Sequence, residues 1–404
     1  MTHANGVATD IDGLVEPGFE GVRDAFLANF AEHGDIGAGV SVHVEGRKVV
    51  ELWGGVADQE TNRPYTEDTL QLVYSTTKGA TAACANLLVQ RGELDVDAPV
   101  ADYWPEFGQA DKEDIPVRWL LCHKAGLPTI DEQLSCEEVL AWEPVIRALE
   151  VQTPIWEPGT AHGYHAVTFG YLVGEVVRRI TGRSLGTYFA DEIAGPLGLE
   201  FWIGLPEEHE HRLAPLIGGL RPADAADLDP KLKDMLEAFI GPDSLLGRTL
   251  TVNGAFRDSD IFNTRAVHEA EIPAANGITN ARSLSRLYAG LVGPLDGAAA
   301  APLLTEAQIH AASTRQTEGA DRCIFINSTF GLGFFTSSPF APYGVKGNFG
   351  HAGMGGSVGF GDPANKVGFG YVMNKMNQNL SADPRTSALI KATYDAIGVP
   401  TKYV

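Results

Sequence analysis

The amino-acid sequence predicts an α+β fold: one antiparallel sheet built from both ends of the chain and flanked by helices, with a helical part inserted between them. Apolar runs typical of strands cluster near the N-terminus and again in the last third of the chain. The stretch between them carries apolar stripes at helical spacing. Strands grouped apart from helices favour an α+β arrangement. We therefore expect residues 1–94 and 326–404 to form a domain of sheet and terminal helices, and residues 95–325 a mostly helical domain.

The first elements are expected to be a helix and a hairpin. Residues 18–30 place apolar side chains at helical spacing. Valines then alternate with polar residues over 40–44, and an apolar run returns over 49–53. Glu45 and Gly46 separate the two runs and predict a tight turn.

The middle and the end of the chain follow the same reasoning. The apolar stripe over 168–180 predicts a helix that stops at Gly182. The charged, weakly periodic stretch over 206–260 predicts an irregular surface segment. Asp383 as N-cap opens a final helix that runs to residue 397. Strands are expected over four short runs, residues 331–336, 348–353, 357–361 and 367–373.

Composition and charge exclude several classes of protein. The net charge of −22 disfavours nucleic acid and anionic membranes as partners, because both need clustered Lys and Arg. No uninterrupted apolar stretch of about 18 residues predicts a membrane span, and the first thirty residues lack a secretory pattern. We therefore expect a cytoplasmic protein. The dispersed cysteines fit reduced thiols: Cys84, Cys122, Cys136 and Cys323.

Ser357 is one candidate nucleophile. Residues 355–359 read G-G-S-V-G and satisfy the G-x-S-x-G pattern of the α/β-hydrolase nucleophile elbow. An elbow serine is followed by a helix and later by a histidine. Two glycines and Pro363 make a poor helix start here, and His351 is the last histidine of the chain. A reordered triad is physically possible, but we favour a strand that lines another residue's site.

Ser75 is the rival nucleophile. Residues 75–78 read S-T-T-K, and an alanine-rich run with good helix propensity follows. Positions i and i+3 share a helix face, so the amine of Lys78 can reach the Ser75 hydroxyl. Lysine in water has a pKa of about 10.4, but small and apolar neighbours would desolvate this amine and make it a usable base. The alternative is a capping serine beside a solvated lysine.

The block W-E-P-G-T-A-H-G-Y-H over residues 156–165 adds a tyrosine to these two residues. It precedes a helix, which places Tyr164 in a loop at a helix start. A tyrosine hydroxyl beside a neutral lysine can serve as base toward Ser75 and as acid toward a leaving group. In the same block, Trp156 and His165 are candidates for the wall of a substrate cleft, with ordinary packing as the alternative for each.

Four motifs together resemble a known superfamily. Residues 75–78, 120–128 (L-L-C-H-K-A-G-L-P), 156–164 and 351–353 (H-A-G) occur in the order found in serine β-lactamase-like hydrolases. That superfamily includes class C β-lactamases, penicillin-binding D,D-peptidases and family VIII carboxylesterases. The resemblance covers most of the chain and implies a β-lactamase/transpeptidase-like fold.

The resemblance also implies a role for single residues. Ser75 would be the acylated nucleophile, Lys78 its activating base and Tyr164 the tyrosine of the Y-x-N motif. The N–H groups of Ser75 and Met354 would form the oxyanion hole. Residues 351–353 fall where the superfamily has K-T-G, beside the cleft, which makes His351 and Gly353 substrate-binding candidates.

Two departures from the motifs bear on the substrate. Ala166 stands where Y-x-N has asparagine, so an amide that would hold an acylamino group is absent. His351 replaces the K-T-G lysine with a weaker, titratable cation, which would hold a β-lactam carboxylate less firmly. Both changes favour esters over penicillins, and the chain resembles family VIII carboxylesterases most.

The sequence therefore predicts a serine carboxylesterase that hydrolyses esters of short acyl chains, with weak or no β-lactamase activity. No cofactor or metal is needed, and the expected partner is a small-molecule ester, with neither nucleic acid nor membrane; a homo-oligomer is left open. The alternatives are an acyltransferase or an amide or β-lactam hydrolase on the same residues, and a non-catalytic ligand-sensing domain.

Two histidine pairs could suggest a metal site. His162 and His165 lie three residues apart, and His209 and His211 two apart. Neither pair has a Cys or carboxylate partner at metal-ligand spacing, and the second pair lies in a charged stretch typical of solvated surface. We expect no metal at either.

Overall fold

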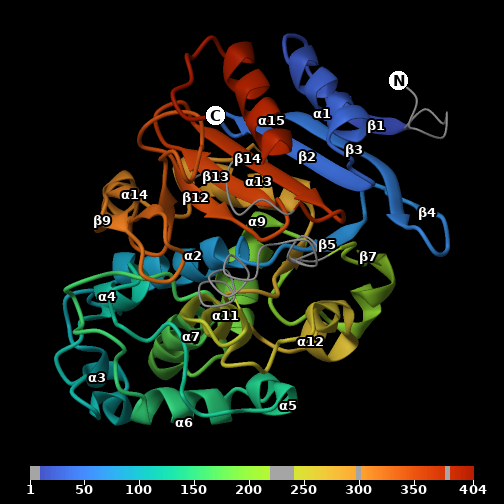
Figure 1. Ribbon diagram of the computed structural model, residues 1–404. Helices are drawn as coiled ribbons and strands as arrows, with labels where there is room; N and C mark the ends of the chain where they lie inside the picture. Colours follow the sequence, from blue (N-terminus) through green and yellow to red (C-terminus); the bar gives the residue numbers. More distant parts are fainter. Residues whose placement is uncertain (1–9, 219–240, 297–301, 378–382) are drawn as a thin grey trace, which may run out of the picture.

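One large antiparallel sheet organises the part of the chain that the computed structural model describes, residues 10–218, 241–296, 302–377 and 383–404. Its strand order is β1-β3-β2-β14-β13-β12-β11-β10-β9, so strands from both ends of the chain meet at its centre, where β2 pairs with β14 (Figure 1). This is the α+β arrangement predicted from the sequence.

The N-terminal strands form as the alternating valines predict. The elements are β1 (Ile11–Val15), α1 (Glu20–Glu32), β2 (Gly37–Val44), β3 (Arg47–Asp58) and β4 (Arg63–Pro64). Between β2 and β3, Glu45 and Gly46 have φ angles of 50° and 82°. Two successive positive φ angles define the hairpin turn whose twist matches that of the flanking strands. The predicted turn at these two residues is confirmed.

The C-terminal strands are β9 (Thr317–Ala320), β10 (Asn327–Phe330), β11 (Phe335–Thr336), β12 (Phe349–Ala352), β13 (Val358–Asp362) and β14 (Val367–Met373). The expected strand over 331–336 is wrong for its first four residues. There Gly331 and Gly333 form a turn between β10 and β11, and Gly333 has a φ of 89°. An alternation of small and apolar residues does not distinguish such a turn from a strand.

Helices cover both faces of the sheet. In Figure 1, α1 and α15 (Pro384–Ala396) lie side by side over one face, and α13 (Ala281–Val292) lies against the other. The side chain of Asp383 accepts a hydrogen bond from the N–H of Arg385, which confirms the predicted N-cap of α15. α13 packs mainly on β14 and β2, so it buries the centre of the sheet.

The remaining helices lie below the sheet in Figure 1, except α14, which lies beside β9 at the left. They are α2 (Thr77–Gln90), α3 (Val100–Tyr103), α4 (Val117–Leu121), α5 (Cys136–Leu140), α6 (Glu143–Val151), α7 (Thr168–Thr181), α8 (Leu185–Phe189), α9 (Gly195–Leu197), α11 (Leu245–Thr251), α12 (Arg265–Glu269) and α14 (Glu306–Ser313). A second, small sheet joins β6 (Phe201–Trp202), β8 (Ile278–Thr279), β5 (Leu70–Leu72) and β7 (Leu213–Ala214). The helix predicted over 168–180 is confirmed, and Gly182 ends it with a φ of 70°.

The predicted domain limits at residues 94 and 326 stay a prediction. The large sheet takes in β9, and its central face is covered by α13; both come from the stretch expected to be helical. The expected irregular segment over 206–260 includes residues 219–240, which lie outside the described residues. Among its described residues, α11 is helical.

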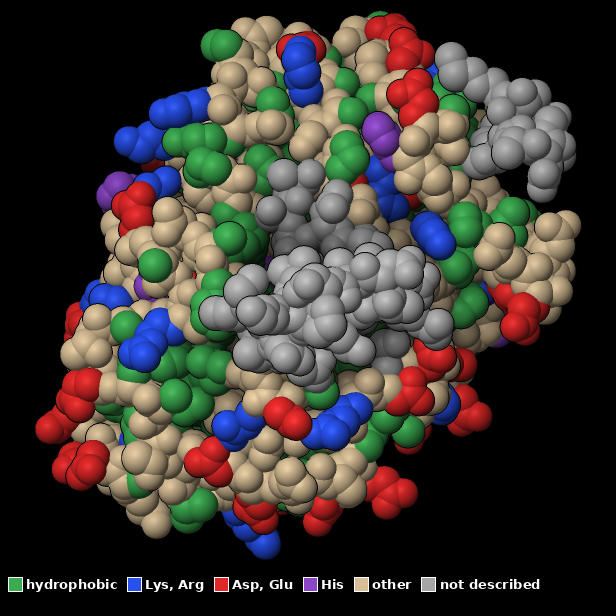
Figure 2. All heavy atoms as spheres, in the orientation of Figure 1, with side chains coloured by type: hydrophobic (Ala, Val, Ile, Leu, Met, Phe, Trp, Pro, Cys, Tyr) green, Lys and Arg blue, Asp and Glu red, His purple; other side chains and the backbone are tan. Residues whose placement is uncertain are grey.

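Acidic side chains are scattered over the visible face of the molecule and do not gather in one patch (Figure 2). In the portion of the chain that the structure describes, no helix has the length and apolar character needed to cross a membrane.

Glycines let α13 approach the sheet. A Cβ on Gly368 of β14 would lie 2.3 Å from the carbonyl oxygen of Ser285 and 2.4 Å from the amide nitrogen of Ala289, both in the backbone of α13. A Cβ on Gly39 of β2 would lie 3.5 Å from its nearest neighbours, an ordinary contact. The backbone of α13 can therefore lie this close to β14 only because residue 368 has no Cβ.

We expect Gly368→Ala to lower the free energy of unfolding by about 1–3 kcal/mol, because the helix backbone must move away from the sheet. Gly39→Ala, at the same interface, is the control and should change it by less than about 0.5 kcal/mol. Urea unfolding of both variants measures the difference; equal effects would contradict the close-approach explanation.

Candidate active site

Ser75 lies in the turn that leads into α2, two residues before the helix begins at Thr77. The preceding residue, Tyr74, has a φ of 43°, a left-handed conformation that is uncommon for a bulky side chain. Its buried ring packs against Phe262 with 4.9 Å between ring centroids. Strained residues of this kind persist where packing holds them and gather at functional sites. The turn exposes Ser75 to a cavity.

Lys78 is fully buried, and its amine touches three oxygen atoms. Nζ lies 3.0 Å from the Ser75 Oγ, 2.6 Å from the carbonyl oxygen of Ala166 and 2.9 Å from that of Ala274. Burial holds the pKa of Lys78 well below its ordinary value. A neutral amine has two N–H groups and one lone pair. When the two carbonyls accept the N–H groups, the lone pair is left to accept the Ser75 hydroxyl proton.

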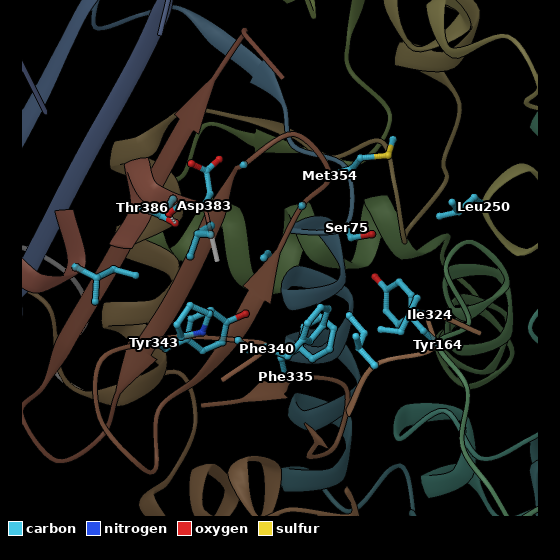
Figure 3. Close-up of a pocket in the computed structure, with 18 of the residues that line it drawn as sticks. Ser75, Tyr164, Leu250, Ile324, Phe335, Phe340, Tyr343, Met354, Asp383 and Thr386 are labelled. Carbon is cyan, nitrogen blue, oxygen red and sulfur yellow. Dashed lines mark hydrogen bonds between the residues drawn. The ribbon is translucent and has the colours of Figure 1, made fainter. Parts of the chain in front are cut away.

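Tyr164 faces Ser75 from the loop before α7, and the two hydroxyl oxygens point toward one another in Figure 3. The ring centroid of Tyr164 lies 4.8 Å from Nζ of Lys78. Burial raises the pKa of the Tyr164 phenol, and its interaction with Ser75 opposes this only in part. The phenol therefore keeps its proton at neutral pH, while burial favours the neutral form of the amine beside it. This divides the two roles: Lys78 can take a proton, and Tyr164 can donate one.

A buried carboxylate fixes the loop that carries Tyr164. Oδ1 of Asp321 accepts the N–H of Tyr164 at 3.0 Å and the N–H groups of Cys323 and Ile324 at 2.8 and 3.0 Å. Ser328 donates to Oδ2 at 2.9 Å. Asp321 therefore ties Tyr164 to the segment that contains Ile324, a residue of the cavity wall.

A tight turn between β12 and β13 presents Met354. The N–H of Gly356 donates to the carbonyl of Gly353 at 3.1 Å, and Gly355 has a φ of 89°, the pattern of a type II turn. Met354 is the first central residue of this turn, so its N–H lies outside the turn's own hydrogen bond. Met354, Gly353 and Ser75 all line the cavity. Backbone N–H groups at such a position can stabilise a developing oxyanion.

Ser357 holds the turn of residues 353–356 against the turn that carries Ser75, called the serine turn below. It is fully buried, and its Oγ donates to the carbonyl of Val73 at 2.9 Å and lies 3.0 Å from Oγ1 of Thr76. A Cβ on Gly353 would lie 2.1 Å from the same Val73 oxygen. The Ser357 hydroxyl is thus committed to the backbone beneath Ser75, and it directly precedes strand β13 rather than standing on a strand-to-helix turn.

The cavity has a volume of about 140 Å³, and its wall is mostly apolar. Ser75, Met354 and Tyr164 lie together in Figure 3, with Leu250 and Ile324 to one side and Phe335, Phe340 and Tyr343 to the other. Further lining residues are Leu246, Ile326, Ala341, Pro342, Ala352, Gly353, Gly356, Val358, Asp383, Thr386 and Ile390. Sequence reasoning missed most of this wall, because an apolar residue that lines a cavity has the same pattern as one in the core.

Three predicted substrate-binding residues, His351, Trp156 and His165, are not part of the cavity wall. Each is buried behind it. Nδ1 of His165 donates to the carbonyl of Gly163 at 2.6 Å and its Nε2 accepts the N–H of Leu127, so this ring braces two loops. Gly353 does line the cavity, as expected.

His351 differs from the expected titratable cation. Its ring stacks on that of Tyr164 at a centroid distance of 6.1 Å and packs at a tilt against that of Phe335 at 4.5 Å. Burial, together with the nearby Lys78, lowers its pKa well below the ordinary value. Nδ1 lies 2.8 Å from the carbonyl of Ala352, which fits a neutral ring with the proton on Nδ1. The site therefore has no cation at this position to attract a carboxylate.

The histidine pairs make no metal site in the described residues, where no group of three or more His, Cys, Asp or Glu side chains could hold an ion. Nε2 of His162 lies 3.0 Å from the hydroxyl of Ser328 and 3.9 Å from Asp321. His162 therefore belongs to the hydrogen-bond network that supports Tyr164.

A serine on a strained turn before a helix, with a buried lysine and a tyrosine beside it, makes this part of the α+β fold a candidate site for a serine nucleophile. A model of the beta-lactamase family matches residues 22–393. The chain therefore belongs to the beta-lactamase family.

Solved structures and a curated relative agree with this family. A family VIII carboxylesterase is 37% identical, with a TM-score of 0.84, over 96% of this chain and 100% of the other. EstA from Arthrobacter nitroguajacolicus Rue61a is 35% identical, with a TM-score of 0.84, over 96% and 99%. Esterase/beta-lactamase LipL from Mycobacterium tuberculosis is 32% identical over 295 residues, 70% of this chain and 66% of LipL. The matches span about half to two thirds of the first curated relatives' own length.

The buried Lys78 predicts how Ser75 reactivity depends on pH. Acid protonates the amine and removes the base, so the rate at which a fluorophosphonate probe labels Ser75 should rise with pH and level off. Because the pKa of Lys78 is lowered, the midpoint should lie well below the value of about 10.4 for free lysine.

Labelling followed from pH 5 to 10 by intact-protein mass spectrometry measures this midpoint. Lys78→Arg, whose side chain stays protonated, is the control and should react slowly at every pH. A wild-type midpoint near 10 would contradict a neutral amine.

Proposed function

We propose that this protein is a carboxylesterase that works through an acyl-enzyme on Ser75. The observation that carries the proposal is the buried amine of Lys78, which lies 3.0 Å from the Ser75 hydroxyl while two carbonyls occupy its remaining hydrogen-bonding positions. The comparisons support it, since a similar solved structure is a family VIII carboxylesterase and a similar relative is an esterase/beta-lactamase.

Acylation begins with proton transfer from the Ser75 hydroxyl to the amine of Lys78 as Oγ attacks the ester carbonyl carbon. The carbonyl oxygen becomes an oxyanion, which the N–H groups of Ser75 and Met354 stabilise. When the tetrahedral intermediate collapses, the bond to the alcohol breaks. Tyr164 donates its phenolic proton to the leaving oxygen and recovers one from Lys78, so the alcohol leaves neutral and both side chains return to their starting states.

Deacylation uses the same groups in reverse order. Water attacks the acyl carbon and gives a proton to the base formed by Lys78 and Tyr164. Ser75 then leaves as the hydroxyl and takes that proton back, and the carboxylic acid is released. Every proton transfer in acylation and deacylation therefore passes through Ser75, Lys78 or Tyr164.

The cavity supports esters with a small apolar group and disfavours anionic substrates. Its volume of about 140 Å³ is close to that of an engineered apolar cavity of about 150 Å³ that binds benzene. A ring or chain of about six carbons would therefore fill it. Buried, neutral His351 supplies no charge for a carboxylate, so weak β-lactam hydrolysis remains part of the proposal.

Replacing each of the two candidate serines by alanine tests which one is the nucleophile. Ser75→Ala should abolish hydrolysis of p-nitrophenyl butyrate, because the acylated oxygen is lost. Ser357→Ala should keep most of it, because this hydroxyl bonds to the Val73 carbonyl and not to substrate. A chromogenic cephalosporin assayed in parallel reports the residual β-lactam activity. Ester hydrolysis that persists in Ser75→Ala would contradict an acyl-enzyme on Ser75.

Chain length tests the proposed substrate size. For wild type, kcat/KM should rise from p-nitrophenyl acetate through butyrate to hexanoate, because each CH₂ that the cavity buries contributes about 0.8 kcal/mol, and it should not rise further for decanoate, whose last carbons the cavity cannot bury. Phe340→Ala enlarges the cavity and should move the optimum to longer chains. Phe19→Ala, a half-buried phenylalanine at the start of α1 and outside this cavity, is the control. An unchanged chain-length profile in Phe340→Ala would contradict the assignment of this cavity.

A further inference from the structure

A buried arginine holds the turn that carries Met354. Arg385, in the first turn of α15, has only 1% of its surface exposed. Its Nη2 donates to the carbonyl oxygen of Gly355 at 2.7 Å, and the N–H of Asn377 donates to the same oxygen at 2.8 Å. Gly355 directly follows Met354, so the carbonyl that Arg385 holds is one residue from the proposed oxyanion donor.

Every N–H group of the Arg385 guanidinium has a partner. Nε donates to Asp383, Nη1 donates to Asp35 at 2.7 Å and to the carbonyl of Lys375 at 2.8 Å, and Nη2 also donates to Asp383 at 2.6 Å. The guanidinium therefore joins four parts of the chain: the segment between α1 and β2, the turn after β12, the segment just after β14 and the start of α15. A planar group with five donors can do this, and a lysine ammonium with three cannot.

The glycine at position 356 makes room for this contact. A Cβ there would lie 2.4 Å from Nη2 of Arg385 and 2.5 Å from Oδ2 of Asp383. The next residue, Ser357, bonds to the carbonyl of Val73, in the segment that carries Ser75. The chain directly after Met354 is thus anchored twice, to α15 through Gly355 and to the segment that carries Ser75 through Ser357.

We propose that Arg385 is a positioning residue for the oxyanion hole. Through the Gly355 carbonyl it sets the distance between the N–H of Met354 and the carbonyl carbon attacked by Ser75. The inference rests on the proposed function for the reaction, but it concerns any acyl or phosphonyl group that Ser75 accepts. A displacement of about 1 Å in such a group can lower a rate about 100-fold, so a change of hydrogen-bonding geometry at Arg385 is enough to be measured.

Two variants disturb the contact from opposite sides. Arg385→Lys keeps the charge but loses the planar donor set, and Gly356→Ala keeps the arginine but pushes it away. Each should lower kcat for p-nitrophenyl butyrate by about 10- to 100-fold while KM changes by less than about threefold, because the lost interaction forms in the transition state. The rate of labelling by a fluorophosphonate should fall by a similar factor. In that reaction Oγ of Ser75 bonds to phosphorus, fluoride leaves and Lys78 takes the proton.

Matched controls separate positioning from stability. Gly319→Ala places alanine at a φ of 123°, close to the 126° of Gly356, but no atom lies within 4 Å of the new Cβ. Arg282→Lys changes a partly buried arginine outside the site, which is paired with Glu51 and Glu200. Both controls should lower the melting temperature and leave kcat within about twofold of wild type.

The outcomes distinguish this inference from the proposed function. Folded Arg385→Lys and Gly356→Ala proteins with wild-type kcat and labelling rates would overturn the role of Arg385; if Arg385→Lys does not fold, Gly356→Ala decides. If wild type hydrolyses no ester yet reacts with the fluorophosphonate, the esterase proposal fails while the labelling rates still test Arg385. If kcat falls by equal factors in the control variants and in the test variants, the positioning role of Arg385 is also overturned.

Discussion

The arrangement of the site depends on one desolvated amine. This amine belongs to Lys78, in the first turn of α2. The two carbonyls that accept its hydrogen bonds belong to Ala166 and Ala274, which are far away along the chain. Burial of a lone ammonium is costly, so the pKa of this amine is lowered, and the two carbonyls orient its N–H groups. The helical part of the molecule therefore sets the basicity of this group, although Ser75 itself precedes α2.

The same amine explains why the Y-x-N departure leaves the nucleophile in place. Ala166 contributes its backbone carbonyl to Lys78, a contact that any residue at this position can make. What the alanine removes is a side-chain amide next to the cavity. Together with His351, which is buried and neutral behind Tyr164, this leaves a site whose recognition is chiefly apolar. Polar chemistry is concentrated at Ser75, Lys78, Tyr164 and the backbone N–H groups.

Close approach between backbones is the second constraint. The turn of residues 353–357 lies against the serine turn because Gly353 has no Cβ to meet the Val73 carbonyl, and it lies against α15 because Gly356 has none to meet Arg385. Ser357, between these contacts and the strand, bonds to the backbone beneath Ser75. The G-x-S-x-G pattern thus arises here from packing, with small residues at a crossing of three segments.

The sequence by itself determined the class of fold and the central strands, and it singled out the three polar residues that the structure brings together: Ser75, Lys78 and Tyr164. Periodicity specified β2, β3 and α7, and the spacing of Ser75 and Lys78 on one helix face is a local property that needs no tertiary information. Tertiary structure alone decided the rest. The burial of His351, Trp156 and His165 behind the cavity, the turn at 331–334 and the contacts of Arg385 with Asp35 and Gly355 depend on segments that are distant in the chain. A pattern of neighbouring residues shows which face of an element is apolar, but it does not show what that face meets.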